Sequence, residues 1–495
     1  MYLGIDLGTS SVKVLVLDAQ HAVLAVADAA LDISRPQPLW SEQDPHAWWK
    51  ALDQAMQQLR SQVPRALSQV RAVGLSGQMH GAVVLGERRQ VLRPAILWND
   101  CRASAQCTAL EAAVPQSRQI TGNLAMPGFT APKLLWLHQH EPEVFAQTRL
   151  VLLPKDWLRL KLTGEAVSDM SDASGTLWLD TGTRCWSAEM LAACGLTEQH
   201  MPRLVEGTGA SAQLLADVAS AWGLPAGVTV AGGAGDNAAT AVGVGAVRPG
   251  QGFVSLGTSG VIFLATDSFR PQPEAAVHAF AHALPQRWHH MSVMLSAASA
   301  FGWVTRLTQR SSEAVLAHEA SLLSLPAREQ APIFLPYLSG ERTPHNDAHA
   351  SGTFIGLRPA HDAPDLAYAV MEGVTFGLMD GLNAIMQGHK PGGEALALVG
   401  GGARSDRWGQ MIASGLERPL TRDEGAQAAA ALGAARLGWM ADGGTEEEVC
   451  LAPKDTAHFE PNAHEASLLQ ERYQKFKTLY PALRPYFFGA QKEAA

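Results

Sequence analysis

The chain has 495 residues, of which 47% are hydrophobic and 17% charged, a balance that supplies a large core and excludes global disorder. Chains beyond about 250–300 residues usually divide their core, so we expect two large lobes rather than one compact domain. The net charge is −9 with an isoelectric point near 6.0, which argues against a general nucleic-acid binder that neutralises phosphates.

The cysteine content indicates a reducing compartment. The five cysteines are scattered and form no C-x-x-C pair, so we expect neither a disulfide framework nor structural zinc. The first residues carry no basic segment, and Asp6 interrupts the apolar run at once. No stretch approaches the roughly 18–20 apolar residues of a membrane span. We therefore expect a cytoplasmic protein without membrane contact.

The first predicted element is a hairpin over residues 4–17, in which two β-type apolar runs flank Gly8, Thr9 and Ser10. The tetrad Leu-Gly-Thr-Ser at residues 7–10 recurs at 256–259, about half the chain later and again between short β-type runs. The repetition predicts two related lobes, each opening with a hairpin whose turn offers backbone N–H groups. Chance is the alternative, because glycine, threonine and serine are common in turns.

The rest of the chain has an α/β pattern. Strand-like runs end near glycines at residues 70–74, 227–231 and 395–399, and helical patterns cover residues 132–139 and 365–379. Residues 243–250, rich in glycine with one proline, predict the crossing between lobes. We therefore expect an N-terminal lobe over residues 1–245, a C-terminal lobe over residues 246–487, and a flexible tail over residues 488–495.

Glycine-rich turns are the candidate phosphate sites, because they expose N–H groups and allow close approach. The dipeptide Gly-Lys does not occur, which excludes a P-loop. Residues 233–238 formally match the dinucleotide pattern G-x-G-x-x-A, but no acidic residue stands about 20 positions on to hold a ribose. Four glycine turns remain, at 8–11, 232–236, 257–260 and 400–403, the last leading into a helix with Ser405 as the expected N-cap. Such a set suits a two-lobed nucleotide phosphotransferase.

These residues resemble the FGGY family of carbohydrate kinases. Residues 4–10 and 257–259 are similar to its two phosphate hairpins, 235–237 to its catalytic turn and 400–403 to its adenosine turn. The stretches 128–137, 352–357 and 365–373 are similar to its longer signatures, which actin-fold chaperones lack. The resemblance covers nearly the whole chain. It implies a two-lobed, actin-like ATPase (ribonuclease H-like) α/β fold with the active site in the cleft between the lobes.

The substrate motif narrows the implied reaction. Residues 76–81 resemble the version found in members that phosphorylate D-xylulose, whereas glycerol-specific members have an Arg-Glu pair where Met79 and His80 stand. The resemblance thus implies transfer of the γ-phosphoryl group of ATP to D-xylulose. The alternatives are another ketose or polyol kinase of the family, for example one acting on ribulose, and an actin-fold ATPase module with a conformational output. Whether the chain forms a homodimer stays open.

The resemblance also implies residue roles. Asp236 is the expected general base, because a sugar hydroxyl needs a carboxylate within hydrogen-bond reach; the alternative is an N-cap for a helix over residues 237–242. Asp6 is expected to hold Mg²⁺, largely through water, or to be a solvated turn residue. Lys13 is expected either to offset phosphate charge or to be an ordinary surface lysine. The expected substrate ligands are Gln78, Met79, His80 and Asn237. The expected nucleotide ligands are Gly8, Thr9, Ser10, Gly257, Thr258, Ser259, Gly401, Gly402 and Asp406.

Overall fold

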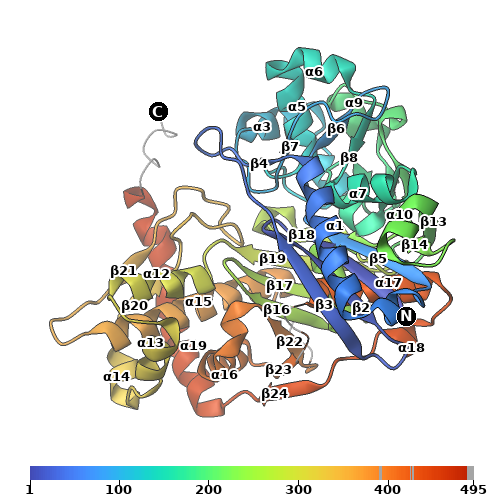
Figure 1. Cartoon of the computed structure of the whole chain (residues 1–495). Helices are drawn as coiled ribbons and strands as arrows, with labels where there is room; N and C mark the ends of the chain where they lie inside the picture. Colours follow the sequence, from blue (N-terminus) through green and yellow to red (C-terminus); the bar gives the residue numbers. More distant parts are fainter. Residues whose placement is uncertain (389–392, 424, 426–427, 488–495) are drawn as a thin grey trace.

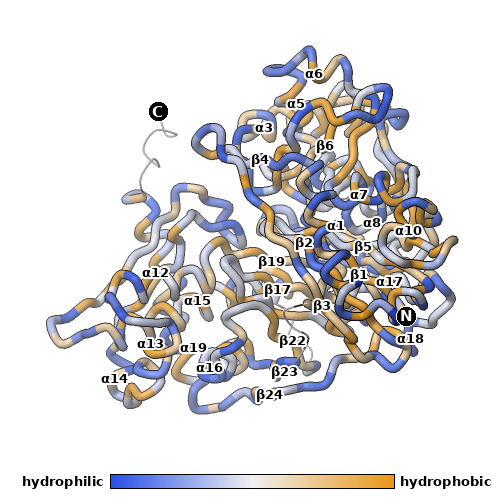
Figure 2. The backbone as a smooth tube through the Cα atoms, in the orientation of Figure 1, coloured by the Kyte–Doolittle hydropathy of each residue, from blue (hydrophilic) through white to orange (hydrophobic). Residues whose placement is uncertain are grey.

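The computed structural model describes residues 1–388, 393–423, 425 and 428–487. The expected tail at 488–495 lies outside these residues. Two α/β halves lie side by side, each built on a mixed sheet (Figure 1). Hydrophobic residues concentrate on the central strands, and the outer turns are hydrophilic (Figure 2). Among the described helices, none has both the length and the apolar character needed to cross a membrane.

The sheet of the first half has the order β13-β14-β5-β1-β2-β3, with β15 beside β5. Strand β1 pairs antiparallel with β2 and parallel with β5, and β5 runs parallel to β14. The predicted hairpin around residues 8–10 is therefore confirmed. The strands are β1 (Tyr2–Leu7), β2 (Ser11–Leu17), β3 (Val23–Ala30), β5 (Ala72–Gly77), β13 (Ala210–Gln213), β14 (Thr229–Ala231) and β15 (Ala234–Gly235).

The sheet of the second half has the order β18-β19-β17-β16-β22-β23-β24. Its β16–β17 hairpin is antiparallel, and β16 runs parallel to β22, which runs parallel to β23. The pairing pattern of the first sheet thus recurs, and the expectation of two related halves is confirmed. The strands are β16 (Gly252–Leu256), β17 (Gly260–Thr266), β18 (His278–Ala281), β19 (Trp288–Met294), β22 (Leu396–Val399), β23 (Leu420–Asp423) and β24 (Asp455–Phe459).

Helices cover both sheets. The expected helix at 365–379 lies inside a long, largely buried helix of the second half, α15. The main helices of the first half are α1 (Pro45–Gln62), α2 (Pro64–Leu67), α7 (Pro154–Thr163), α10 (Ala216–Trp222) and α11 (Asp236–Gly243). Those of the second half are α12 (Ala298–Leu307), α13 (Glu313–Ser321), α14 (Leu325–Gln330), α15 (Ala363–Met386), α16 (Asp406–Leu416), α17 (Ala429–Ala441), α18 (Glu446–Val449) and α19 (Ala463–Leu483).

A helical subdomain inserted between β5 and β13 was not anticipated from the sequence. Its hydrophobic core includes Met79, Phe129 and Trp178 and continues into Phe280 and Met291 of the second half. The subdomain lies at the top of Figure 1. The helix expected at 132–139 lies within its α5. Its helices are α3 (Ser104–Ala113), α4 (Ser117–Thr121), α5 (Thr130–His140), α6 (Pro142–Gln147), α8 (Met170–Ser174) and α9 (Ala188–Ala193). Its short strand pairs are β6 (Val83–Leu85) with β8 (Leu150–Leu152), β9 (Val167–Asp169) with β12 (Arg203–Val205), and β10 (Leu179–Asp180) with β11 (Cys185–Trp186). Its β7 (Ala95–Ile96) pairs with β4 (Glu42–Gln43), which lies earlier in the chain, before α1.

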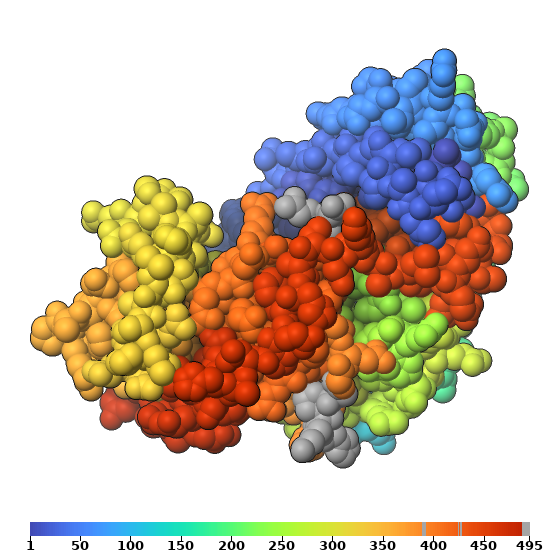
Figure 3. Space-filling model, turned by 90° about the horizontal axis from the view of Figure 1, so that it is seen from below, coloured from blue at the N-terminus to red at the C-terminus, as the bar shows by residue number. Residues whose placement is uncertain are grey.

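Helix α17 from the second half packs on the sheet of the first half. A Cβ atom on Gly4 would lie 1.9 Å from the Ala431 carbonyl oxygen, and one on Gly74 would lie 1.7 Å from that of Ala434. The strand expected to end near Gly74 therefore runs on to Gly77, because this glycine serves close packing and not a turn. Figure 3 shows red and orange segments of the second half against the blue N-terminal segments. The two halves are joined through backbone-to-backbone contact.

Candidate active site

The first glycine turn is held by side chains behind it. The Gly8 N–H donates to the Ser11 carbonyl oxygen at 3.0 Å, which closes the hairpin. The Thr9 hydroxyl accepts from Trp98 Nε1 at 2.9 Å, and the Thr9 carbonyl oxygen accepts from Gln43 Nε2 at 2.8 Å. Ser10 is exposed at the tip. The turn is thus fixed in position while its outer edge stays open to a ligand.

Gln78 lies behind this turn. It is 1% exposed, and its Oε1 accepts from the Thr9 hydroxyl at 3.2 Å. Its Nε2 donates to Gln43 Oε1 at 3.1 Å and to the Gly8 carbonyl oxygen at 3.5 Å. Both amide hydrogens are therefore used inside the protein. This geometry favours a role in supporting the phosphate turn over the predicted direct contact with substrate.

Asp6 faces the space between the two halves. Its Oδ1 accepts from the Ser76 hydroxyl at 2.8 Å. Burial raises the pKa of this carboxyl, while the Ser76 bond and the charge of Lys13, its partner across the hairpin, act in the opposite direction. A cavity of about 180 Å³ adjoins Asp6, and its walls come from both halves. The lining residues are Asp6, Asn237, Thr240, Phe253, Ser255, Val399, Gly400, Ala428, Ala429 and Ala430.

Asp236 is the first residue of α11, and Gly235 is its N-cap. The alternative in which Asp236 is the N-cap is therefore wrong. Its Oδ1 accepts from the Asn237 backbone N–H at 2.7 Å and from Asn237 Nδ2 at 2.9 Å. Burial and the charge of Asp6 raise the pKa of Asp236 to about 7. Within the described residues Oδ2 has no hydrogen-bond partner, so the carboxyl keeps one oxygen for a ligand.

His80 has a defined orientation and a neutral ring. Its Nδ1 lies 2.7 Å from the Gly175 carbonyl oxygen, which can only accept, so the ring proton is assigned to Nδ1 and Nε2 is an acceptor. Burial lowers the pKa of His80 to about 3. The His80 backbone has φ of 69°, a left-handed conformation uncommon for a side-chain-bearing residue. Thr130 Oγ1 and Lys133 Nζ hold it by donating to the His80 carbonyl oxygen at 3.0 and 2.8 Å.

Met79 connects His80 to the Asp236 turn. It is 5% exposed, and a Cβ atom added to Gly235 would lie 2.8 Å from Met79 Cγ. A Cβ atom on Gly175 would meet both the His80 ring and Met79 Cε. The two glycines thus let the predicted substrate motif approach the predicted base. Met79 forms an apolar wall between them.

Residues from the second half also approach His80, and sequence reasoning missed them. Phe280 lies 6.1 Å from the His80 ring between centroids and stacks on His278. His278 Nδ1 bonds Asn123 Oδ1 at 2.8 Å, and its Nε2 lies 3.4 Å from an Arg342 guanidinium nitrogen. Among the described residues no carboxylate lies within 4.0 Å of that guanidinium. No local motif marks Arg342; only the tertiary structure brings it here.

The second predicted phosphate turn docks on the start of α12. The carbonyl oxygens of Gly257 and Thr258 accept from the N–H groups of Ala298 and Ala297 at 2.8 and 2.9 Å. Ser259 completes the turn. A Cβ atom on Gly400 would lie 2.8 Å from the Leu256 backbone, and Gly400 has φ of 94°. Only glycine therefore allows the predicted adenosine turn to lie against the second hairpin.

A cavity of about 450 Å³ lies between this turn and α12 and α13. Gly401 and Gly402, both predicted nucleotide ligands, line it together with Phe301 and Trp408. Ser405 caps α16 as expected, accepting from the Trp408 N–H. Asp406 is not among the lining residues; it pairs with Arg422 at 2.8 Å, and Arg422 also donates to the Ala403 carbonyl oxygen. Asp406 therefore supports the turn from outside.

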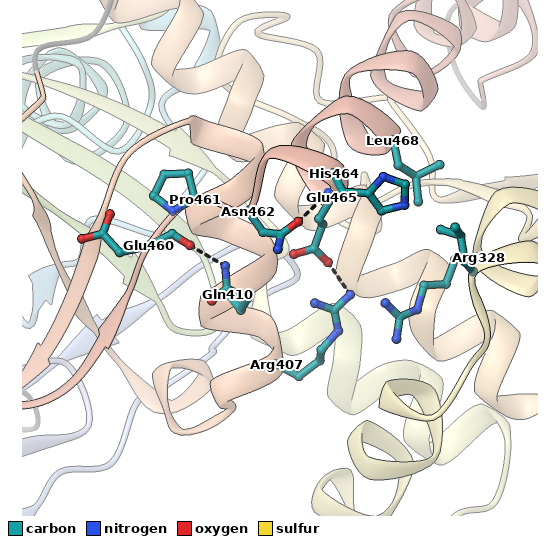
Figure 4. A pocket seen from close by; sticks show the side chains of 10 residues that line it. Arg328, Arg407, Gln410, Glu460, Pro461, Asn462, His464, Glu465 and Leu468 are labelled. Atoms are coloured by element: carbon teal, nitrogen blue, oxygen red, sulfur yellow. Dashed lines mark hydrogen bonds and ion pairs between the residues drawn. The ribbon is translucent and has the colours of Figure 1, made fainter.

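A further cavity of about 500 Å³ lies beside the 450 Å³ cavity, and Arg407 lines both of them. Figure 4 shows Arg407 paired with Glu465 and facing Arg328 across the cavity. On the side of this cavity away from Arg328, Gln410 Nε2 donates to the Glu460 carbonyl oxygen at 2.6 Å. None of the sequence-predicted site residues lines this cavity.

Comparison with known proteins identifies the class. Residues 1–243 match the N-terminal domain of the FGGY family of carbohydrate kinases, and residues 252–441 match its C-terminal domain. The chain belongs to this family and is a sugar kinase that uses ATP.

Individual relatives are more specific. The chain is 52% identical to a xylulose kinase of Escherichia coli over 490 residues, 98% of this chain and 99% of the relative. It is 53% identical to a xylulose kinase of Klebsiella pneumoniae over 445 residues, 89% and 90% of the two chains. A solved structure described as a xyloylose kinase from Brucella ovis has 50% identity and a TM-score of 0.94, covering 98% and 99%. The resemblance to the family and its actin-like fold are thus confirmed.

Proposed function

We propose that the chain transfers the γ-phosphoryl group of ATP to the terminal hydroxyl of D-xylulose, giving D-xylulose 5-phosphate and ADP. The observation that carries this proposal is the placement of His80 and Met79 against the Asp236 turn. The relatives named xylulose kinase support the choice of sugar. A cytoplasmic setting is part of the proposal, and the five free cysteines support it.

Asp236 acts as the general base. Its Oδ2 accepts the hydroxyl proton as the sugar oxygen forms its bond to phosphorus, and the bond from phosphorus to the ADP oxygen breaks. A base with a pKa near the working pH balances availability against proton affinity, and the pKa of about 7 meets that condition. Asn237 holds Oδ1 and so directs Oδ2 away from α11.

His80 Nε2 accepts a hydrogen bond from a sugar hydroxyl. Because the ring is neutral and its tautomer is fixed by Gly175, this site accepts and does not donate. The Arg342 guanidinium supplies donors to the sugar oxygens from the opposite half. Met79 gives the apolar surface beside them. A pocket with fixed donors and acceptors rejects sugars that leave those groups unpaired.

The two hairpin turns bind the phosphates. Phosphoryl transfer needs alignment and charge neutralisation more than covalent help. The Gly8 and Gly257 N–H groups close their own turns by donating to the Ser11 and Ser259 carbonyl oxygens. The N–H groups of Thr9, Ser10, Thr258 and Ser259 supply the donors to phosphate, and the two glycines allow the phosphates to approach. Lys13, opposite Asp6, adds positive charge on the same face.

The Asp6 region suits Mg²⁺. Asp6 has a buried carboxylate with one oxygen bonded to Ser76, and the adjoining cavity has room for the waters that magnesium retains. When bound, the ion neutralises charge on the phosphate oxygens. Asp6 holds it, and Ser76 fixes the orientation of Asp6.

Adenosine occupies the 450 Å³ cavity, with Gly401 and Gly402 against it and Phe301 and Trp408 as apolar walls. The division of the chain at 245/246 follows from this arrangement: the first lobe supplies the base and most of the sugar site, and the second supplies the adenosine site. The two family domains, the first ending at 243 and the second beginning at 252, support that boundary.

The test is a coupled ADP-release assay across ketopentoses, ketohexoses and glycerol. We expect kcat/KM to be highest with D-xylulose and ATP turnover without sugar to be small. A higher kcat/KM for another ketose would replace D-xylulose as the substrate. ATP turnover independent of any sugar would instead favour an ATPase with a conformational output.

A further inference from the structure

A buried charge cluster lies behind the Asp236 turn. Lys155 Nζ lies 2.6 Å from Asp156 Oδ1, 2.6 Å from Asp169 Oδ2 and 3.0 Å from Asp172 Oδ2, and all four side chains are 0% exposed. The three carboxylates are close enough to hold a metal ion, but the ammonium group lies among them. The cost of burying so many charges makes a cluster of this kind a rigid feature once it is formed.

A chain of hydrogen bonds leads from this cluster to the catalytic turn. Asp169 Oδ1 accepts from the Ser171 hydroxyl at 2.6 Å, and Ser171 Oγ accepts from the Gly235 N–H at 3.1 Å. Gly235 is the residue directly before Asp236. Among the residues that the structure describes, Ser171 is therefore the one side chain that links the Asp169 carboxylate to the peptide that starts α11.

The other end of the turn is tied to the same cluster. Arg159, also 0% exposed, donates to the carbonyl oxygens of Ala231 and Gly232 and to the Ser211 hydroxyl. The segment from Ala231 to Gly235 is thus held at both ends, although its glycines would otherwise allow wide backbone freedom.

Helix α8 carries Ser171 and also leads to His80. Its C-terminal neighbour, Gly175, accepts from His80 Nδ1 at 2.7 Å. Asp169 caps the start of α8 by accepting from the N–H groups of Ser171 and Asp172. One short, buried helix thus contacts both the turn of the base and the sugar-binding histidine.

We propose that Ser171 is a positioning residue: its hydroxyl, fixed by Asp169 and through it by Lys155, holds the Gly235 peptide and so aims the Asp236 carboxylate at the sugar hydroxyl. The proposal rests on the function proposed above, in which Asp236 is the base. Loss of the hydroxyl leaves a buried N–H unpaired, which the turn relieves by shifting. A displacement of ~1 Å at a reacting group lowers rates by up to ~10²-fold.

Ser168 offers a matched control. It is 1% exposed, lies in β9, and donates to Asp156 Oδ2 at 2.6 Å in the same cluster, but it makes no bond to the turn. We expect S171A to lower kcat by ~10–100-fold with sugar KM changed by less than ~3-fold. We also expect the acid limb of kcat/KM to move to lower pH, because a displaced Asp236 is better solvated. We expect S168A to lower Tm comparably and to leave kcat and the pH profile unchanged.

A double variant separates this proposal from the assignment of the base. If Ser171 acts through Asp236, S171A causes no further fall in kcat in a D236A background. Equal loss of kcat in S171A and S168A, or an S171A effect that persists undiminished in D236A, would overturn the positioning role. Near-wild-type kcat in D236A alone would overturn the base assignment instead. If S171A unfolds, S171T, which keeps a hydroxyl, provides the second variant: a kcat close to that of the wild type supports the proposal, and a kcat lowered ~10–100-fold although the hydroxyl is kept contradicts it.

Discussion

The raised pKa of Asp236 links catalysis to stability in a measurable way. Asp236→Asn keeps the oxygen that accepts from Asn237 and removes the ionisable proton. The pKa is about 7 in the folded protein, against 3.8 for an ordinary aspartate carboxyl. Between these values the unfolded chain is ionised while the folded protein still holds its proton. Over that interval, each rise of one pH unit therefore lowers the free energy of unfolding of the wild type by ~1.4 kcal/mol relative to the variant.

At pH 8 the free energy of unfolding of Asp236→Asn should exceed that of the wild type by at most ~4 kcal/mol. Partial exposure of the Asp236 side chain reduces this difference to ~2–4 kcal/mol. Because the folded pKa is raised, the stability that the proton supplies is present below pH 3.8 and is lost as the pH rises through 7. Asp236→Asn should therefore be more stable than the wild type at pH 8 and equally stable near pH 4. At ~2 °C per kcal/mol for a lobe of this size, the gain in Tm is ~4–8 °C.

Scanning fluorimetry of both proteins from pH 4 to 8.5, without nucleotide or magnesium, measures this difference. The pH 4 pair is the internal control. In the coupled assay the same variant should lose ~10²–10⁴-fold in kcat, the usual contribution of a positioned general base. A Tm difference that stays constant across the pH range, or a wild type that is the more stable at pH 8, would refute the reasoning about burial and the Asp6 charge.

Three further predictions concern the sugar site and the cleft. His80→Ala should reduce discrimination among epimeric ketopentoses while leaving the Kd for ATP within ~2-fold; kcat/KM ratios unchanged across a sugar panel would make His80 structural. Arg342→Gln should raise sugar KM by ~10-fold, the equivalent of a lost charged hydrogen bond, and unchanged KM would remove Arg342 from the sugar site. Adding D-xylulose with a non-hydrolysable ATP analogue should lower the radius of gyration in small-angle scattering, because Asp236 and the predicted adenosine turn lie on different halves that close around the ligands. Glycerol in place of D-xylulose should not lower the radius of gyration. Identical scattering profiles under all conditions would contradict ligand-driven closure.

The sequence predicted those parts of the structure that depend on local chemistry. The Leu-Gly-Thr-Ser tetrads located both hairpins, because turn residues act within a few positions. The Ser405 cap was predicted for the same reason. Gly74 was misinterpreted as a strand end, since the reason for it is the Ala434 carbonyl oxygen, 360 residues away in the chain.

In the candidate site too, the sequence predicted residues that lie in short motifs and missed residues that only the tertiary structure brings together. Asp236 and His80 lie in short motifs, whereas Phe280 beside His80 and Arg342 beside His278 are brought to the site only by tertiary structure. The buried Lys155 cluster left no sequence signal either, because charged residues spaced like these are ordinarily solvated. Gln78 stands inside the predicted motif, yet its amide bonds Thr9 and Gln43 behind the predicted phosphate turn.

The contact of α17 with the first sheet bears on how the protein is made. The helix that covers Gly4 and Gly74 ends at residue 441, roughly 200 residues after α11 completes the first half. At ~5–20 residues per second a ribosome needs ~10–40 s to supply it. During that interval one face of the nascent sheet, including Tyr2 and Leu15 that later pack with α17, has no cover. The first half therefore completes its packing only after α17 has been synthesised, and until then this apolar face is open to aggregation.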